Sequence, residues 1–93
     1  MIHHIIVKWN DKVDKQDLSQ KVKELFANAV NVSGVNKVEI KDNVTPRDNR
    51  YDIMIAIHMN SDALCTWDNS ELHKKWKAEY GNMIEKKCIF DCE

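Results

Sequence analysis

The chain has 93 residues, of which 43% are hydrophobic and 31% charged, with a formal net charge of −1. This length suits one domain, so residues 1–93 are treated as a single domain. The charge balance gives no basic surface for nucleic acid or an anionic membrane, and no apolar run is long enough to span a bilayer. The three cysteines lack Cys-x-x-Cys spacing, which favours reduced thiols and a cytoplasmic location.

Residues 2–9 (IHHIIVKW) predict a strand with two apolar faces. Because side chains alternate along a strand, its residues form two sets: Ile2, His4 and Ile6, and His3, Ile5, Val7 and Trp9. A strand that is apolar on both sides is typical of the middle of a covered sheet.

Residues 14–31 predict a helix that begins at Asp14 as its N-cap and ends before Gly34. Its apolar stripe comprises Leu18, Val22, Leu25, Phe26 and Ala29. Residues 35–41 (VNKVEIK) alternate between apolar and charged side chains, which favours a half-exposed strand at a sheet edge.

Residues 51–59 (YDIMIAIHM) predict a second central strand, with Tyr51, Ile53, Ile55 and Ile57 on one face and Met54, Ala56 and His58 on the other. Ser61 and Ser70 suit the N-caps of a short helix and of a longer one over about 71–84. We expect the longer helix to point Leu72, His73, Trp76, Tyr80 and Ile84 inward. Residues 86–92 predict a last short strand.

The resulting order, β-α-β-β-α-α-β, predicts an α+β fold. Right-handed crossovers place both helical connections on one face of the sheet. The ferredoxin-like strand order 4-1-3-2 puts the two doubly apolar strands in the middle of an antiparallel four-stranded sheet.

The helices can cover only one side of this sheet. The other side still shows Ile5, Val7, Met54 and Ala56, or their neighbours of opposite parity. A monomer rarely leaves so large an apolar patch to water. We therefore expect a homodimer that pairs through the sheet face and closes an α+β barrel.

Four segments in chain order resemble the stress-responsive dimeric A/B barrel family: HHIIVKW, VEIKDNVTPRDNRYDIMI, TWDNSELHKKW and CIFDC. The resemblance implies a ferredoxin-like protomer that dimerises into a barrel with its helices outside. It also implies a stress-associated protein without assigned activity that binds a small ligand.

One plant member of this family cyclises a linear polyketide without a cofactor, through a first-strand histidine and the last histidine of a His-Pro-x-His motif. By position, the resemblance implies His4 and His73 as the acid and base in this chain. The His-Pro pair is replaced by Ser70 and Glu71, and Trp67 stands near the family's tyrosine.

We expect His4 and His73 to line one pocket between sheet and helices, since neutral imidazole suits proton transfer near neutral pH. The pocket wall would comprise Ile6, Val38, Ile53, Ile55, Trp67, Trp76 and Ile84, suited to a small apolar or aromatic ligand. The alternative interpretation is that both rings only satisfy hydrogen bonds in a small core.

His3 and His58 are expected on the face of the dimer barrel, forming interface hydrogen bonds. A metal ion bound by these histidines at the dimer interface is the alternative. No metal or other cofactor is expected, because neighbouring strand residues cannot bind one ion together and no third ligand follows at a recognisable spacing. The lysines at 74, 75 and 77 are interpreted as a solvated helix face, with phosphate binding as the alternative.

Three functions are compatible with these patterns. The first is a small-ligand-binding barrel protein without catalysis. The second is a cofactor-independent cyclase or lyase acting on a polyketide-like or aromatic substrate through His4 and His73. The third is a monooxygenase-like dimeric α+β barrel.

Overall fold

The computed structural model describes all residues from 1 to 93. Its elements are β1 (Ile2–Trp9), α1 (Lys15–Phe26), η1 (Ala27–Asn31), β2 (Val35–Asp42), β3 (Ile53–Met59), α2 (Leu64–Asp68), α3 (Glu71–Tyr80), η2 (Gly81–Met83) and β4 (Ile84–Cys92). Every expected element is present. The main differences are at the ends, where the last turns of both long helices tighten into the 3-10 segments η1 and η2. The expected cap at Ser61 is wrong, because α2 begins after Ala63 without a side-chain cap.

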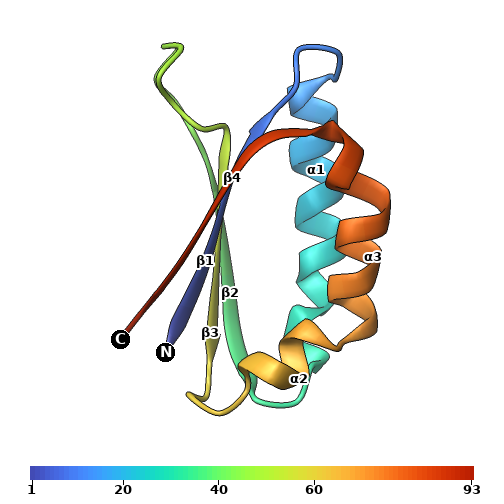
Figure 1. Cartoon of the computed structure of the whole chain (residues 1–93), viewed down its shortest axis with the longest axis vertical. Coiled ribbons are helices and arrows are strands. Elements are labelled where there is room, and N and C mark those ends of the chain that lie inside the picture. The colour runs from blue at the N-terminus through green and yellow to red at the C-terminus, as the bar shows by residue number, and fades with distance from the viewer.

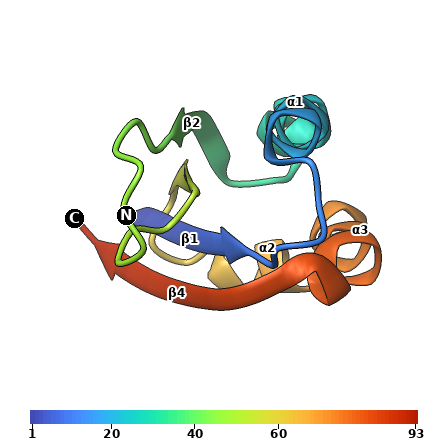
Figure 2. The same cartoon turned by 90° about the horizontal axis from the view of Figure 1, so that it is seen from above.

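The four strands form one antiparallel sheet in the order β2-β3-β1-β4, as the expected order 4-1-3-2 requires. Both long helices lie on the same side of this sheet and leave its other side open (Figure 1). Seen from above, α1 lies towards β2 and α3 towards β4 (Figure 2). None of the helices is long and apolar enough to cross a membrane.

Local capping explains where the two long helices begin. The Asp14 carboxylate accepts hydrogen bonds from the backbone N–H groups of Gln16 and Asp17, each at 3.1 Å. Ser70 caps α3 in the same way, accepting from the N–H of His73 at 3.2 Å. Gly34 adopts a φ of +89°, and a Cβ there would lie 2.6 Å from that of Ala63, so this turn requires glycine.

The core is a packed layer between the sheet and the helices. Three tryptophans fill much of it: Trp9, Trp67 and Trp76 are each at most 2% exposed. Phe26 of α1 meets Trp76 of α3 edge-on, with ring centroids 5.2 Å apart. Side chains of this size leave a close-packed layer in this small domain.

Burial alternates strictly along β1, and it does so in the phase opposite to the one expected. His3, Ile5, Val7 and Trp9 are buried under the helices, whereas Ile2, His4, Ile6 and Lys8 lie on the open face. The expectation that His4 and Ile6 face the helices is therefore wrong. Cross-strand register explains the result, because Ile5 lies opposite Ile55 and Ile6 lies opposite Met54.

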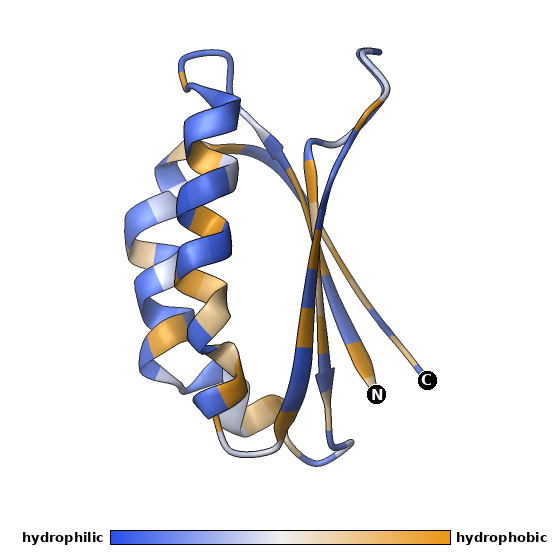
Figure 3. Ribbon diagram, turned by 180° about the vertical axis from the view of Figure 1, so that it is seen from behind, coloured by the Kyte–Doolittle hydropathy of each residue, from blue (hydrophilic) through white to orange (hydrophobic).

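The open face of the sheet retains a large apolar component. Hydrophobic segments alternate with polar ones along the strands (Figure 3). The register places Ile2, Ile6, Met54, Ala56 and Phe90 on this face, together with His4 and His58. Phe90 is 60% exposed, so this face is available for a partner.

Candidate functional site

A histidine–aspartate pair joins the first and last strands on the helix side of the sheet. His3 lies opposite Asp91 in the pairing of β1 with β4. The His3 Nδ1 atom is 2.5 Å from Asp91 Oδ1, and His3 as a whole is only 6% exposed. A buried imidazole needs a hydrogen-bond partner, and the carboxylate of the edge strand supplies it.

A second histidine, His73, lies in the first turn of α3. Its Nδ1 atom is 3.0 Å from the backbone oxygen of Asp68, and its ring packs against Trp67 at a centroid distance of 5.6 Å. The Ser70 cap fixes the backbone of the same turn. The Trp67 indole N–H, buried beside this ring, has no hydrogen-bond partner and is an unused donor.

These partners determine which nitrogen of each ring holds its proton. A backbone carbonyl only accepts hydrogen bonds, so His73 must donate from Nδ1 to Asp68. The Asp91 carboxylate likewise accepts from Nδ1 of His3. In their neutral forms, both imidazoles therefore carry an unprotonated Nε2.

The two histidines line the same hollow, which lies between α3 and β4 and has a volume of about 280 Å³. Its other lining residues are Leu64, Asp68, Lys77, Lys87, Ile89 and Asp91. Two imidazoles, two carboxylates, two ammonium groups and two apolar side chains thus border one hollow. Such a mixture can bind and orient a small polar molecule and move a proton on it.

His4 does not share this hollow, so the expected pairing of His4 with His73 in one pocket is wrong. The His4 Nδ1 atom instead contacts the Phe90 backbone oxygen at 3.2 Å on the open face. The structure places His3 in the position expected for His4. A shift of one residue along β1 moves a side chain to the other face of the sheet, which explains the error.

His58 lies on the open face, as expected, but His3 does not join it there. The His58 Nε2 atom lies 2.8 Å from Glu39 Oε1. That hydrogen bond, followed by the nearby charge of Lys37, holds the pKa of Glu39 below its ordinary value. The open face therefore carries its own histidine–carboxylate pair.

Six of the seven residues expected to form one apolar pocket wall lie in or against the packed core. Ile53, Ile55, Trp67 and Trp76 belong to that core, and Val38 and Ile84 pack against it. Ile6 lies on the open face, where it borders a hollow near Tyr51 together with Ile53. The expected internal pocket is thus filled by side chains, and the hollow that contains histidines lies at the sheet edge.

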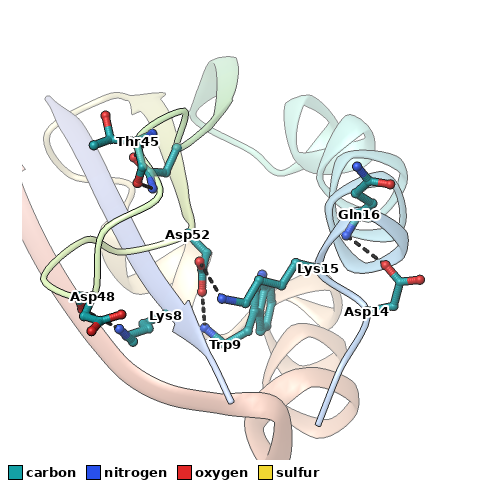
Figure 4. Close-up of polar contacts among 9 residues, drawn as sticks. Lys8, Trp9, Asp14, Lys15, Gln16, Thr45, Asp48 and Asp52 are labelled. Carbon is teal, nitrogen blue, oxygen red and sulfur yellow. Dashed lines mark hydrogen bonds and ion pairs between the residues drawn. The ribbon is translucent and has the colours of Figure 1, made fainter. Parts of the chain in front are cut away.

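A larger hollow, about 440 Å³, lies elsewhere, between α1 and the ends of β2 and β3. Asp52 organises it: its Oδ2 accepts from the backbone N–H of Trp9 at 2.7 Å, and its Oδ1 accepts from Lys15 at 3.2 Å (Figure 4). Lys23 pairs with Asp42 at 2.8 Å in the same hollow. These charged groups pair with one another within the protein. We therefore interpret this hollow as a structural contact between elements and not as a ligand site.

Sequence reasoning missed Asp91, Lys77 and Lys87 as members of the site. The sequence did contain a signal for Asp91. The expected strand order pairs the first and last strands antiparallel, which places the end of the last strand beside the start of the first. Lys77 and Lys87 gave no distinct signal, because each is one of several charged residues on its helix or strand. No group of three His, Cys, Asp or Glu residues is placed to hold a metal ion, and all three cysteines are unpaired.

No protein-family model and no curated protein matches this sequence. Solved structures do. A dimeric protein of unknown function and ferredoxin-like fold from Bacteroides fragilis matches with a TM-score of 0.82 and 21% identity, covering 99% of this chain and 93% of that one. A dabb family protein from Mesorhizobium loti has a TM-score of 0.65 and 17% identity, covering 99% and 94%.

A hydroxynitrile lyase from Passiflora edulis also matches, with a TM-score of 0.77, 13% identity, and coverage of 96% of this chain and 87% of that one. This chain has the ferredoxin-like fold. Identities this low establish the arrangement of strands and helices, while the chemistry must be argued from the side chains of this chain.

Proposed function

We propose that this chain belongs to the stress-responsive dimeric A/B barrel family and acts as an acid–base catalyst on a small hydroxyl or carbonyl compound. The observation that carries the proposal is the pairing of buried His3 with Asp91 in the hollow that His73 also lines. A carboxylate that orients a histidine while leaving its Nε2 free is the arrangement used to position a general base.

The proposed chemistry needs only proton transfers and no cofactor. One imidazole removes the proton of a substrate hydroxyl, and the oxygen electrons form a carbonyl as the adjacent carbon–carbon bond breaks. The electron pair of that bond leaves with the departing group, which takes a proton from Nε2 of the other ring in its doubly protonated, imidazolium form. The reverse direction is an addition, and intramolecular addition is a cyclisation.

The site geometry favours this chemistry over a purely structural role for the two rings. A ring that only fills space in a core needs no access to solvent, whereas both imidazoles border an accessible hollow. The hydroxynitrile lyase of similar fold is one example of a lyase on this scaffold.

The homodimer expected from the sequence is part of the same proposal. Several structures of similar fold are dimeric. The open sheet face offers Ile6, Met54 and Phe90 as its apolar surface, and a second copy across a two-fold axis would cover it. A cytoplasmic location agrees with three unpaired cysteines.

Binding of a small ligand without turnover is the second candidate function. It is favoured by Ser70 and Glu71, which replace two residues of the motif that the resemblance implies. The monooxygenase-like alternative needs the internal apolar pocket, and Trp67 and Trp76 fill that layer. It therefore has less support than either use of the hollow at the sheet edge.

The test is a ligand screen observed at the histidines, using protein with isotope-labelled imidazole rings. The panel contains small ketones, hydroxynitriles such as mandelonitrile, and hydroxy acids. Compounds that bind should shift the His3 and His73 signals and leave those of His4 and His58 in place. For mandelonitrile, turnover is followed by release of benzaldehyde, and for ketones by deuterium exchange next to the carbonyl.

Three variants separate the candidate functions: His3→Gln, His73→Gln and the matched control His4→Gln. Turnover should fall by about 100-fold or more in the first two, as expected for loss of a general acid or base, and should stay unchanged in the control. Binding without turnover would select the second candidate. Ligands that shift only His4 or His58 would refute the proposed site.

A further inference from the structure

Two lysines border the hollow that contains His3 and His73. Lys77 follows His73 by four residues on α3, so the two side chains lie on one face of the helix, one turn apart. Lys87 precedes Asp91 by four residues on β4, opposite Val7, and so lies on the helix side of the sheet. The hollow thus has one lysine from each of its two walls.

Neither lysine has an anionic partner within the protein. Lys74, in the preceding part of α3, forms an ion pair with Glu71 at 3.6 Å. Asp91 shares the hollow with both lysines but is paired with His3. The two ammonium groups are therefore free to bind an anion that enters the hollow.

The charges around the lysines limit what that anion can be. Asp68 and Asp91 line the same hollow and repel negative charge. A doubly charged phosphate doubles the attraction of the two lysines and the repulsion of the two aspartates alike, so it gains little over a singly charged carboxylate, while its desolvation costs more. A lysine ammonium group binds an anion as a point charge, so it does not need a partner that presents two oxygens in one plane.

We propose that the substrate of this site carries a carboxylate, which Lys77 and Lys87 hold while His3 and His73 act on its hydroxyl or carbonyl end. This inference rests on the proposed function and adds a substrate class to it, namely small hydroxy or oxo acids. Fixing one end of such a molecule orients the reacting end. The volume of about 280 Å³ suits a molecule below drug size.

The probes are mandelate and its neutral amide, mandelamide, which have nearly the same shape. Each is titrated into the protein at low ionic strength while the His73 ring signal is followed. Mandelate should bind about tenfold more tightly than mandelamide, as two partly exposed ion pairs allow. Added salt should reduce this difference, because it screens exposed charges.

Lys77→Met with Lys87→Met should abolish the preference for mandelate over mandelamide. The matched control combines Lys75→Met on α3 with Lys86→Met on β4, two lysines that do not line the hollow. That control should keep the preference. Asp68→Asn should strengthen mandelate binding, because it removes a repulsive charge without changing the size of the side chain.

The possible results separate this inference from the proposed function. If both probes shift His3 and His73 with equal affinity, the site stands and the carboxylate preference is refuted. If the double lysine variant keeps the preference, the role of the lysines is refuted. If neither probe, nor any compound of the wider panel, shifts these rings, both proposals fail together.

Discussion

The two faces of β1 carry almost the same chemistry and meet different surroundings. His3 and Ile5 lie under the helices, while His4 and Ile6, the next residues of the same types, lie on the open face. His3 is 6% exposed and paired with a carboxylate, whereas His4 contacts a backbone oxygen near the surface. Residue type alone therefore does not decide what a strand residue does. The face on which it lies does.

The two faces of the sheet also differ in how deeply each histidine–carboxylate pair is buried. The His3 side chain is 8% exposed beside Asp91, and the His58 side chain is 29% exposed beside Glu39. Loss of one partner costs more stability in the buried pair, because water cannot replace the lost hydrogen bond there. The following substitutions test this contrast, beginning with the largest expected effect.

The isoleucine pair should show the largest difference in folding stability. Ile5→Ala leaves a cavity in a packed layer and should lower the free energy of unfolding by about 2–5 kcal/mol. Ile6→Ala should cost less than half as much at protein concentrations low enough to favour monomers. Urea denaturation of both variants measures the difference, and equal losses would mean that the two faces are not distinct.

A charge on the open face should break the proposed dimer. Ile6→Asp places a carboxylate between Met54 and Cys88 and should weaken association by about 2–4 kcal/mol, roughly 30- to 1,000-fold. Val30→Asp, at a residue 49% exposed on the helix side, should leave association unchanged. Sedimentation across a concentration series measures the association of both variants. A wild-type chain that stays monomeric at all concentrations would refute the dimer.

Removing the carboxylate of each histidine pair compares the two faces directly. Asp91→Ala leaves the buried His3 donor without a partner and should lower the free energy of unfolding by about 1–3 kcal/mol. Glu39→Ala should have a smaller effect, since water can reach His58. Thermal unfolding at neutral pH gives both values, and a greater loss for Glu39→Ala would reverse the proposed contrast.

The smallest expected effect is a titration on the open face. The hydrogen bond from His58 and the charge of Lys37 lower the pKa of Glu39, so its carboxyl signal in an NMR titration should have a midpoint below 4.5. A lowered folded-state pKa stabilises the fold above the unfolded value, and this contribution is lost as the pH falls through the folded-state pKa. His58→Gln should raise the midpoint, and an unchanged midpoint would contradict the assigned cause.

The sequence by itself determined the elements, their order and the strand order. Apolar periodicity located each strand and helix, and Asp14 and Ser70 marked helix starts because capping is a local interaction. Two doubly apolar strands had to occupy the middle of the sheet, which left few topologies to consider. The same pattern indicated that one face of the sheet would remain without helices.

Only the tertiary structure decided which face of β1 the helices cover. Both sets of residues on that strand are apolar and each contains a histidine, so alternation could not distinguish them. The choice depends on cross-strand register and on the fit of Trp9 against Trp76, contacts between residues far apart in the chain. The candidate site depends on that choice. The sequence predicted His73 as a member of it, while His3, Asp91 and the two lysines border the same hollow only because the fold places α3 beside β4.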